Sequence, residues 1–368
     1  MIQRLIRKED LSRGIIREMF MQVLREEQPD LQQGAFLAAL AAKGETPEEV
    51  AGAWQAIRTI DTIKVDLEVP GPVIDNCGTG MDHIKTFNIS TSASILAAAA
   101  GLVLARHGAR AITSACGTVN LAEALGVDVE SGFEVVKRSI ETCGLGLFNG
   151  ASPKVHPRGL FRILSQIRFG TTLNIAGSLS SPVRPDLGVR GVFDPRMVKD
   201  VAEVMREIGY REALVFHGFE EEGGRGMDEV SNLGPTIFCR LKANGSLEDF
   251  TVQPEDVGLK RARAVDLAPL QSPREEAVSL VRILLGLEDG PRVDIICLNA
   301  APIFMLAGKA GDLKAGVALA REVLFSGRAL TKLREWVAFQ NQDSDKGLGR
   351  LQQVMRQAGG GAGVTNLR

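Results

Sequence analysis

Residues 75–126 read DNCGTGMDHIKTFNISTSASILAAAAGLVLARHGARAITSACGTVNLAEALG, and they carry the strongest signal of fold and function in the chain. A glycine-rich turn at residues 78–80 is followed by an apolar helical run that starts near Ser90. Glycines let a backbone approach a ligand closely, and the first turn of a helix presents unpaired N–H groups to an anion. The pattern predicts a phosphate-binding loop. Its polar side chains are Thr79, Ser90 and Thr91 as donors, and Asp82 as an acceptor for a sugar hydroxyl or a magnesium-bound water.

The loop lacks the Gly-Lys-Ser/Thr of a Walker loop and the glycine spacing of a dinucleotide-binding turn. Downstream lie Arg106-His107-Gly108 and Thr113-Ser114-x-x-Gly117-Thr118. Together these segments resemble the anthranilate phosphoribosyltransferase family, whose pattern is GTGGD, NxST, KHGN and SSxxGSAD. The resemblance continues in the same order to about residue 340, through residues 151–157, 173–182, 217–218, 227–236, 298–301 and 308–310.

The resemblance implies transfer of a 5-phosphoribosyl group from phosphoribosyl pyrophosphate to an aromatic amine, with release of pyrophosphate and a need for Mg²⁺. It implies a magnesium site at Asp228 and Glu229, with Ser90 as a third ligand. It implies contacts to the acceptor from His107, Ala109, His156, Arg162 and Gln166, and no catalytic base is assigned. The implied phosphoribosyl pyrophosphate site consists of Gly78, Thr79, Gly80, Asp82, Thr86, Asn88, Ser90, Thr91, Arg106, Gly108 and Thr118.

The chain departs from the family pattern in the phosphate loop. Met81 stands for the second glycine of GTGGD, Arg106 for the lysine of KHGN, and Asn120 for the aspartate of GSAD. Arg106 keeps the positive charge and can bind a phosphate through two nitrogen atoms.

The acceptor site departs as well. Ala109 replaces the asparagine of KHGN, and the segment before Asn174 is shorter, so the family arginine expected near Gln166 has no counterpart. Arg162 and Arg168 are the alternatives for a carboxylate-binding cation. These changes predict that anthranilate is a poor acceptor or none, while phosphoribosyl transfer is retained.

The remaining histidines are predicted to have structural roles rather than to contact a substrate. His217 ends an apolar run and is predicted to pair with backbone at a strand end, and His83 is predicted to fill the loop.

Composition restricts the function. The 368 residues carry a net charge of −2, which gives no electrostatic reason to expect nucleic acid or a membrane surface as partner. The longest apolar run, residues 92–105, is too short to span a bilayer, and residues 1–14 are too charged for a signal peptide. The five cysteines are scattered and odd in number, so we expect free thiols and a cytoplasmic protein.

The expected fold is α/β: a small all-helical domain plus a larger domain with a mostly parallel central sheet, as in nucleoside phosphorylase II. Residues 10–60 show helical periodicity for about four amphipathic helices, with a helix start at residues 46–49. Short apolar segments after residue 73 predict strands: PVIDNCG, LVLARHG, REALVFHG and RVDIICLNA. The alanine-rich residues 94–105 are predicted to form a core helix.

Chain organisation follows from the same pattern. We expect a helical domain at 1–70, completed by the helix and loop of residues 153–190, and an α/β domain at 71–152 and 191–342. Residues 343–368 form a tail with a flexible, glycine-rich end. The apolar residues of the second helix, Ile15, Ile16, Met19, Phe20 and Leu24, suggest a homodimer through the helical domain, as the resemblance implies.

Two alternatives remain open at this stage. A nucleoside phosphorylase would use inorganic phosphate in the same loop, although that class does not need Asp228 and Glu229. A non-catalytic binding protein that kept the fold is suggested by Met81, Ala109 and Asn120.

Overall fold

The computed structural model describes residues 1–80, 84–110, 116–167, 169–220 and 224–359. Predictions for Met81, Asp82, His83 and Arg168, and for the glycine-rich end from residue 360, fall outside these ranges. None of the helices formed by the described residues has the length and apolar character that a membrane crossing requires. All five cysteines are described, and each is a free thiol, as predicted.

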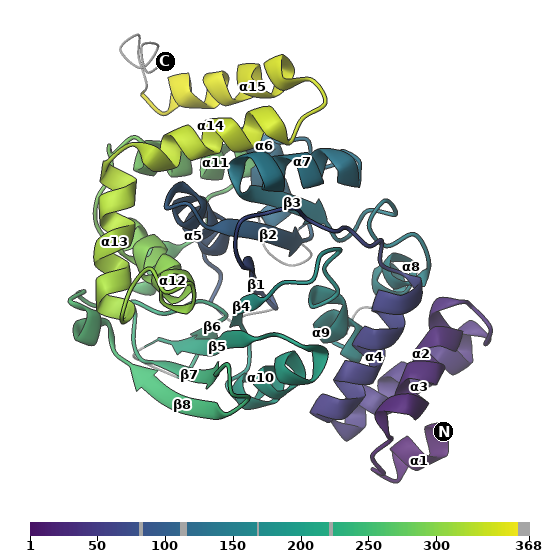
Figure 1. Cartoon of the computed structure of the whole chain (residues 1–368). Coiled ribbons are helices and arrows are strands. Elements are labelled where there is room, and N and C mark those ends of the chain that lie inside the picture. The colour runs from purple at the N-terminus through teal and green to yellow at the C-terminus, as the bar shows by residue number, and fades with distance from the viewer. Residues whose placement is uncertain (81–83, 111–115, 168, 221–223, 360–368) are drawn as a thin grey trace.

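The N-terminal part of the chain is a helical bundle that lies to one side of the sheet (Figure 1). Thr46 and Glu49 form a capping box at its last helix: the Thr46 hydroxyl accepts from the Glu49 N–H at 3.2 Å, and the Glu49 carboxylate accepts from the Thr46 N–H at 2.9 Å. The predicted helix start at residues 46–49 is therefore confirmed. The bundle consists of α1 (Ile2–Ile6), α2 (Arg13–Leu24), α3 (Asp30–Lys43) and α4 (Pro47–Ile60), joined by α8 (Gly159–Gln166) and α9 (Thr172–Ser178).

Two details of the bundle correct the sequence analysis. Residues 10–60 hold three helices rather than four, because α1 precedes that window. Ile16, Phe20 and Leu24 are buried inside the bundle, where the Phe20 ring meets the Phe36 ring edge-on at 5.4 Å. These three residues therefore stabilise the bundle itself, whereas Ile15 and Met19 of the same helix stay half-buried.

A mixed, mostly parallel sheet forms the centre of the larger part of the molecule, as predicted. Its order is β3-β2-β1-β4-β5-β7-β8, with β6 paired to β5. β1 to β5 are parallel, and β5, β7 and β8 run antiparallel. The C-terminal ends of the parallel strands meet at one edge, where ligands commonly bind in α/β sheets. The strands are β1 (Val73–Gly78), β2 (Val103–Gly108), β3 (Leu145–Asn149), β4 (Leu187–Gly191), β5 (Glu212–Phe219), β6 (Gly226–Met227), β7 (Thr236–Leu241) and β8 (Leu247–Val252).

Helices cover the sheet on both faces (Figure 1). One apolar cluster joins α5 and α12 to the strands, while α10 packs against β5 and β7 from the side of the bundle. The other helices are α5 (Ile89–Ala99), α6 (Thr118–Leu125), α7 (Phe133–Cys143), α10 (Met197–Ile208), α11 (Pro273–Leu284), α12 (Pro291–Leu306), α13 (Leu313–Phe325), α14 (Arg328–Phe339) and α15 (Ser344–Gln357). Two short 3₁₀ helices, η1 (Pro254–Val257) and η2 (Ala264–Leu267), complete the list.

Three sequence predictions about these elements are wrong. RVDIICLNA lies in α12 and is not a strand: Pro291 occupies its first turn, and the helix is buried between α5 and α13. A helix buried on all sides is apolar all round, so its residues read like a buried strand. The alanine-rich helix ends at Ala99 because Gly101 adopts a positive φ of 85° before β2. β4 begins at Leu187, within the segment predicted to be helix and loop.

The predicted tail begins with a further helix. α15 lies along α14 (Figure 1) and buries Leu351, Val354 and Met355. It is therefore part of the apolar core of the α/β part rather than an appendage.

Candidate active site

A cavity of about 320 Å³ lies between the C-terminal ends of β1 and β2 on one side and helices α8 and α9 on the other. Most residues predicted for a phosphoribosyl or acceptor site meet in its wall: Gly78, Thr79, Gly80, Thr86, Asn88, Ser90, His107, Gly108, Ala109, Thr118, His156, Asp228 and Glu229. Four other predicted residues within the described ranges do not line it: Thr91, Arg106, Arg162 and Gln166.

The glycine loop after β1 is held in place by backbone contacts. The Thr79 N–H donates to Gly191 O at 3.0 Å, and the Thr79 hydroxyl accepts from the Phe193 N–H at 3.0 Å. Gly80 has a φ of 69°, and its N–H donates to Asp228 Oδ2 at 2.7 Å. A Cβ at Gly78 would lie 2.1 Å from that same oxygen, so any larger residue there would displace the Asp228 carboxylate. Of the two N–H groups named here, that of Thr79 is thus used by Gly191, and that of Gly80 already binds an anionic group, the carboxylate of Asp228.

Helix α5 starts at the cavity. Asn88 is its N-cap residue, yet its side chain makes no capping hydrogen bond. Asn88 Oδ1 is buried and has no partner among the described residues. A buried unpaired acceptor is costly, so its place in the cavity wall suits a ligand hydroxyl that donates to it. Ser90 follows in the first turn, where the N–H groups of the helix are unpaired.

Arg106 lies beneath this loop rather than in the cavity, and only 2% of its surface is exposed. Its guanidinium donates to Asn76 O at 3.0 Å, to Ser90 Oγ at 2.9 Å and to Thr91 Oγ1 at 2.5 Å. Neither Arg106 nor Thr91 lines the cavity, where direct contact with the phosphoribosyl group was predicted for both. Arg106 instead holds the Ser90 hydroxyl in place from behind.

A second helix N-terminus, that of α6, faces the cavity beside β2. Its N-cap Gly117 donates its N–H to Asn120 Oδ1 at 3.2 Å, and Thr118 lines the cavity. Asn120 thus supplies the acceptor oxygen that an aspartate would supply at this position. Gly108 packs against Thr118, whose Cγ2 would be 3.0 Å from an added Cβ.

The carboxylates Asp228 and Glu229 enter from a loop that follows β6. Asn299 of α12 holds this loop: its Oδ1 accepts from the Val230 N–H at 2.8 Å, and its Nδ2 donates to Val230 O at 2.9 Å. Gly191 allows the close approach, since an added Cβ would lie 1.7 Å from Asp228 O. Sequence analysis did not assign a role to Asn299, because the contact joins residues far apart in the chain.

Two adjacent carboxylates suit Mg²⁺, which takes one or two protein carboxylates and completes its shell with waters and phosphate oxygens. Within the described ranges, no group of three or more His, Cys, Asp or Glu gathers as an all-protein metal cage. Ser90 Oγ already accepts from the Arg106 guanidinium, so a metal ion bound there would face a neighbouring cation. The donor set therefore fits magnesium at Asp228 and Glu229 and favours a phosphate contact for Ser90.

His107 and His156 form a buried pair in the cavity wall, with their Nε2 atoms 3.1 Å apart. His156 Nδ1 lies 2.8 Å from Asp61 O, which assigns the proton to Nδ1, and His107 then donates from its Nε2. Burial, followed by the neighbouring His156, lowers the pKa of His107 from 6.5 to about 3, and burial lowers the pKa of His156 to about 4. Both rings are therefore neutral at pH 7.

The Asp61 side chain positions the start of α8, the helix that supplies part of the cavity wall. Its two oxygens accept from the Arg158 N–H at 2.5 Å and the Leu160 N–H at 2.7 Å. Asp61 thus anchors both His156, through its carbonyl, and the first turn of α8, through its carboxylate.

The wall that α8 and α9 present is mostly apolar. Leu160, Leu164 and Leu173 line it, with Asn174, Gly177 and Ser178. Arg162 points away from the cavity and pairs with Glu26 at 2.9 Å and with Asp30 at 3.5 Å, and Gln166 is exposed. The structure therefore does not place Arg162 or Gln166 in the cavity wall. The spacing of Leu160 and Leu164, four residues apart on one helix face, was the signal that could have identified this wall.

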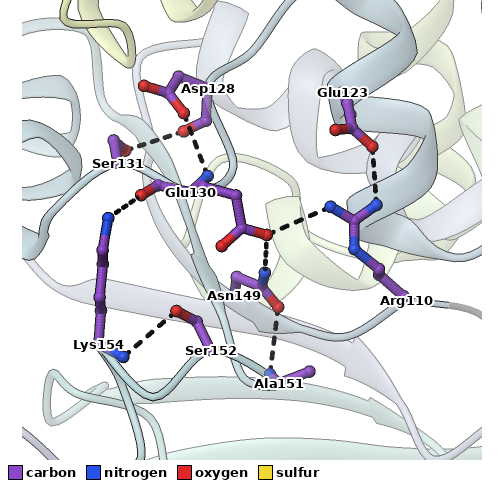
Figure 2. Close-up of polar contacts among 9 residues, drawn as sticks. All are labelled: Arg110, Glu123, Asp128, Glu130, Ser131, Asn149, Ala151, Ser152 and Lys154. Atoms are coloured by element: carbon purple, nitrogen blue, oxygen red, sulfur yellow. Dashed lines mark hydrogen bonds and ion pairs between the residues drawn. The ribbon is translucent and has the colours of Figure 1, made fainter.

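Arg110, next to Ala109, belongs to a polar network beside the cavity (Figure 2). Its guanidinium bonds to Glu123 at 2.7 Å and to Glu130 at 3.2 Å. Glu130 also accepts from Asn149 Nδ2 at 3.0 Å, and its carbonyl accepts from Lys154 Nζ at 2.5 Å. The network ties the end of β2 to α6 and to the loop after β3.

His217 lies elsewhere, with its Nδ1 2.7 Å from Val192 O, as predicted for a strand-end residue.

Comparison with known proteins assigns the chain to a family. Residues 70–330 match the model of the glycosyl transferase family a/b domain, and residues 1–59 match the helical bundle domain of the same family. Anthranilate phosphoribosyltransferase from Desulfosudis oleivorans is 37% identical over 92% of this chain and 97% of its own. The enzyme of that name from Methanothermobacter marburgensis is 37% identical over 90% and 95%.

Solved structures agree with this assignment. The crystal structure of anthranilate phosphoribosyltransferase from Thermus thermophilus matches with a TM-score of 0.82 and 35% identity, over 92% of this chain and 98% of its own. The Saccharomyces cerevisiae enzyme, solved with phosphoribosyl pyrophosphate and magnesium, matches in fold with a TM-score of 0.79 and 24% identity, over 92% and 96%. The chain therefore belongs to the anthranilate phosphoribosyltransferase family of pentosyl-transferring enzymes.

Proposed function

We propose that this enzyme moves the 5-phosphoribosyl group from phosphoribosyl pyrophosphate to an aromatic amine, releases pyrophosphate and requires Mg²⁺. The observation that carries the proposal is the meeting, in one cavity, of a glycine loop, two helix N-termini and the carboxylates Asp228 and Glu229. The names of the relatives support it, since they are anthranilate phosphoribosyltransferases.

Each part of the cavity has a task in this reaction. The N–H groups of the glycine loop and the first turns of α5 and α6 bind phosphate oxygens, where charge builds as pyrophosphate leaves. Asn88 Oδ1 accepts from a ribose hydroxyl. The amine nitrogen forms a bond to the ribose C1 as the bond from C1 to the pyrophosphate oxygen breaks, and the amine then loses a proton. The helical wall holds the amine on the side of C1 opposite to the leaving group, and such positioning supplies a large share of the rate.

Asp228 and Glu229 would hold the magnesium ion, which when bound neutralises charge on the leaving pyrophosphate. In this structure Asp228 accepts from the Gly80 N–H, a donor that a phosphate oxygen would also use. If Asp228 held magnesium, its carboxylate would bind this N–H less strongly, and the N–H could donate to a phosphate oxygen of the substrate. This links metal binding to phosphate binding through a single carboxylate.

The first prediction concerns magnesium and the donor substrate. Calorimetric titration of the full chain with phosphoribosyl pyrophosphate should show binding that tightens at least about 10-fold with Mg²⁺. The double variant Asp228→Ala, Glu229→Ala should lose this tightening, whereas Asp345→Ala, an exposed carboxylate on α15, should keep it. Equal tightening in the double variant would show that the metal assignment is wrong. Tighter binding of inorganic phosphate, without use of phosphoribosyl pyrophosphate, would favour a nucleoside phosphorylase instead.

We further propose a cytoplasmic enzyme, which the five free thiols support, because a reducing compartment keeps thiols unpaired.

A further inference from the structure

We propose that Arg292 of α12 is a positioning residue for the donor substrate. It holds Phe87, and with Phe87 the start of α5, in the place where phosphoribosyl pyrophosphate binds. Arg292 itself does not line the cavity, whereas Phe87 does. The inference rests on the proposed function, because it concerns the binding of the same donor.

Phe87 connects the cavity wall to the apolar core. Its side chain is 7% exposed and packs in the large apolar cluster of the α/β part. The next residue is Asn88, the N-cap of α5, and Ser90 follows in the first turn. Asn88 and Ser90 are the residues proposed to bind the ribose and a phosphate. The position of the Phe87 backbone therefore decides where these two polar side chains lie.

The Arg292 guanidinium lies over the Phe87 ring, with its Cζ 4.9 Å from the ring centroid. A cation at this distance is attracted to the face of an aromatic ring. The guanidinium is planar, so it can stack on the ring while its N–H groups donate to acceptors in its own plane. The contact therefore restricts the ring and leaves the N–H groups available to other partners.

The same guanidinium holds the backbone to which Phe87 is hydrogen-bonded. Arg292 Nη2 donates to Ala268 O at 2.7 Å, and Arg292 Nε donates to Asp266 O at 3.2 Å. Between these two carbonyls lies that of Leu267, which accepts from the Phe87 N–H at 3.2 Å. Arg292 therefore fixes Phe87 twice, through its ring and through the segment that binds its N–H.

Helix α12 gives Arg292 a rigid base that also serves the proposed magnesium loop. The helix is buried and packs against α5 and α13 (Figure 1). Its Asn299 holds Val230, directly after the carboxylate pair. Its Pro291 O, next to Arg292, accepts from Asn232 Nδ2 of the same loop at 3.0 Å. One helix therefore supports both the magnesium loop and the start of α5, the two parts that must meet the same substrate.

Calorimetric titration of the full chain with phosphoribosyl pyrophosphate and Mg²⁺ tests the proposal. Arg292→Met removes the guanidinium and keeps an unbranched side chain. We expect its Kd to rise about 10-fold, the equivalent of one lost hydrogen bond to a charged group. A purely structural role would lower the unfolding temperature and leave the Kd unchanged, and an unchanged Kd overturns the proposal.

Arg282→Met on α11 is the matched control. Arg282 lines the same open surface groove as Arg292 and pairs with Glu288 at 2.6 Å. The control removes the same charge and should keep the Kd of the parent. An equal rise in both variants would mean that any nearby positive charge has this effect, and it overturns the proposal.

Arg292→Lys separates positioning from charge. Lysine keeps the cation but cannot donate to both carbonyls at once, so it should recover only part of the lost affinity. Full recovery would assign the effect to charge alone and overturn the proposal. Thermal unfolding identifies a variant that fails to fold. If Arg292→Met is such a variant, Arg292→Lys must still bind the donor more weakly than the parent for the proposal to stand.

A double-mutant cycle with Phe87→Leu tests whether Arg292 acts through Phe87. The combined variant Phe87→Leu, Arg292→Met should lose less affinity than the product of the two single losses, because both changes remove the same contact. A combined loss equal to that product would show that the two residues act independently, and it overturns the proposed role.

Failure of this inference is distinguishable from failure of the proposed function. A parent that binds phosphoribosyl pyrophosphate with Mg²⁺, together with an Arg292→Met variant that binds it equally well, overturns only the role of Arg292. A parent that does not bind phosphoribosyl pyrophosphate overturns both proposals.

Discussion

At the scale of single residues, the site depends on buried polar groups that touch no substrate. Arg106 holds Ser90, and Asp61 joins the His156 ring to the start of α8. Removing one partner of such a buried contact leaves the other unpaired, which costs about 1–3 kcal/mol. Substitutions of Arg106 or Asp61 should therefore alter both the stability of the protein and the binding of its substrates.

The buried histidine pair predicts a pH dependence of stability. The pKa values of His107 and His156, about 3 and about 4, lie below the 6.5 of an unfolded histidine. Between these values the unfolded chain binds more protons, so the stabilisation is complete above about pH 6.5 and is lost as the pH falls. Each ring should account for about 2 kcal/mol of unfolding free energy between pH 7 and pH 5.

Urea unfolding at pH 7, 6 and 5 measures this dependence. The double variant His107→Gln, His156→Gln should lose less free energy than the parent over the same interval, since its amides do not titrate. A double variant as pH-sensitive as the parent would contradict the assignment of neutral rings.

At the scale of elements, α12 holds the loop proposed to bind magnesium, although it contributes no residue to the cavity lining. Its Asn299 makes two hydrogen bonds to the backbone of Val230, directly after Glu229. The helix is buried and packs against α5 and α13, so it is a rigid support.

Asn299→Leu should therefore have two effects. The unfolding free energy should fall by about 2 kcal/mol, because the Val230 N–H and C=O lose their partners. The tightening of phosphoribosyl pyrophosphate binding by Mg²⁺ should also fall at least about 10-fold in calorimetry. Cys297→Ala on the same helix is the control: it removes buried volume, lowers stability and should keep the magnesium effect. A variant that is destabilised but keeps its magnesium dependence would assign Asn299 a purely structural role.

At the scale of the whole molecule, the cavity lies between the helical bundle and the α/β part. Large apolar side chains remain exposed on the bundle: Leu31 of α3 is 90% exposed and Ile6 of α1 is 69% exposed. Exposed apolar groups of this kind mark interaction surfaces when they occur on neighbouring elements. They join the half-buried Ile15 and Met19 of α2 as candidates for a subunit interface, whereas Ile16, Phe20 and Leu24 are buried by the bundle.

We expect a homodimer through this face of the bundle. Light scattering at micromolar concentration should give twice the chain mass for the parent and one chain mass for Ile6→Glu, Leu31→Glu. Val265→Glu, at a site 68% exposed on the α/β part, should remain dimeric. A monomeric parent would refute the prediction.

The sequence by itself determined the features that depend on a few adjacent residues. Backbone conformation and local hydrogen bonds determine the glycine loop, the start of α5 and the capping box of α4. Short sequence motifs therefore predict these three features. The sequence also indicated a candidate magnesium site at residues 228 and 229, because two adjacent carboxylates are visible in the sequence itself. Ordered motifs over most of the chain also identified the family.

Only the tertiary structure decided which side chains face the cavity. Arg106 and Arg162 carry charge that suggests phosphate or carboxylate binding, yet Arg106 is buried under the loop and Arg162 pairs with Glu26, after α2, and with Asp30 of α3. The apolar run in α12 was read as a strand, since a fully buried helix and a buried strand have the same composition. Leu164 reaches the cavity wall because α8 packs against α2 and α9. Such facts depend on contacts between residues far apart in the chain, where packing rather than local propensity sets the direction of each side chain.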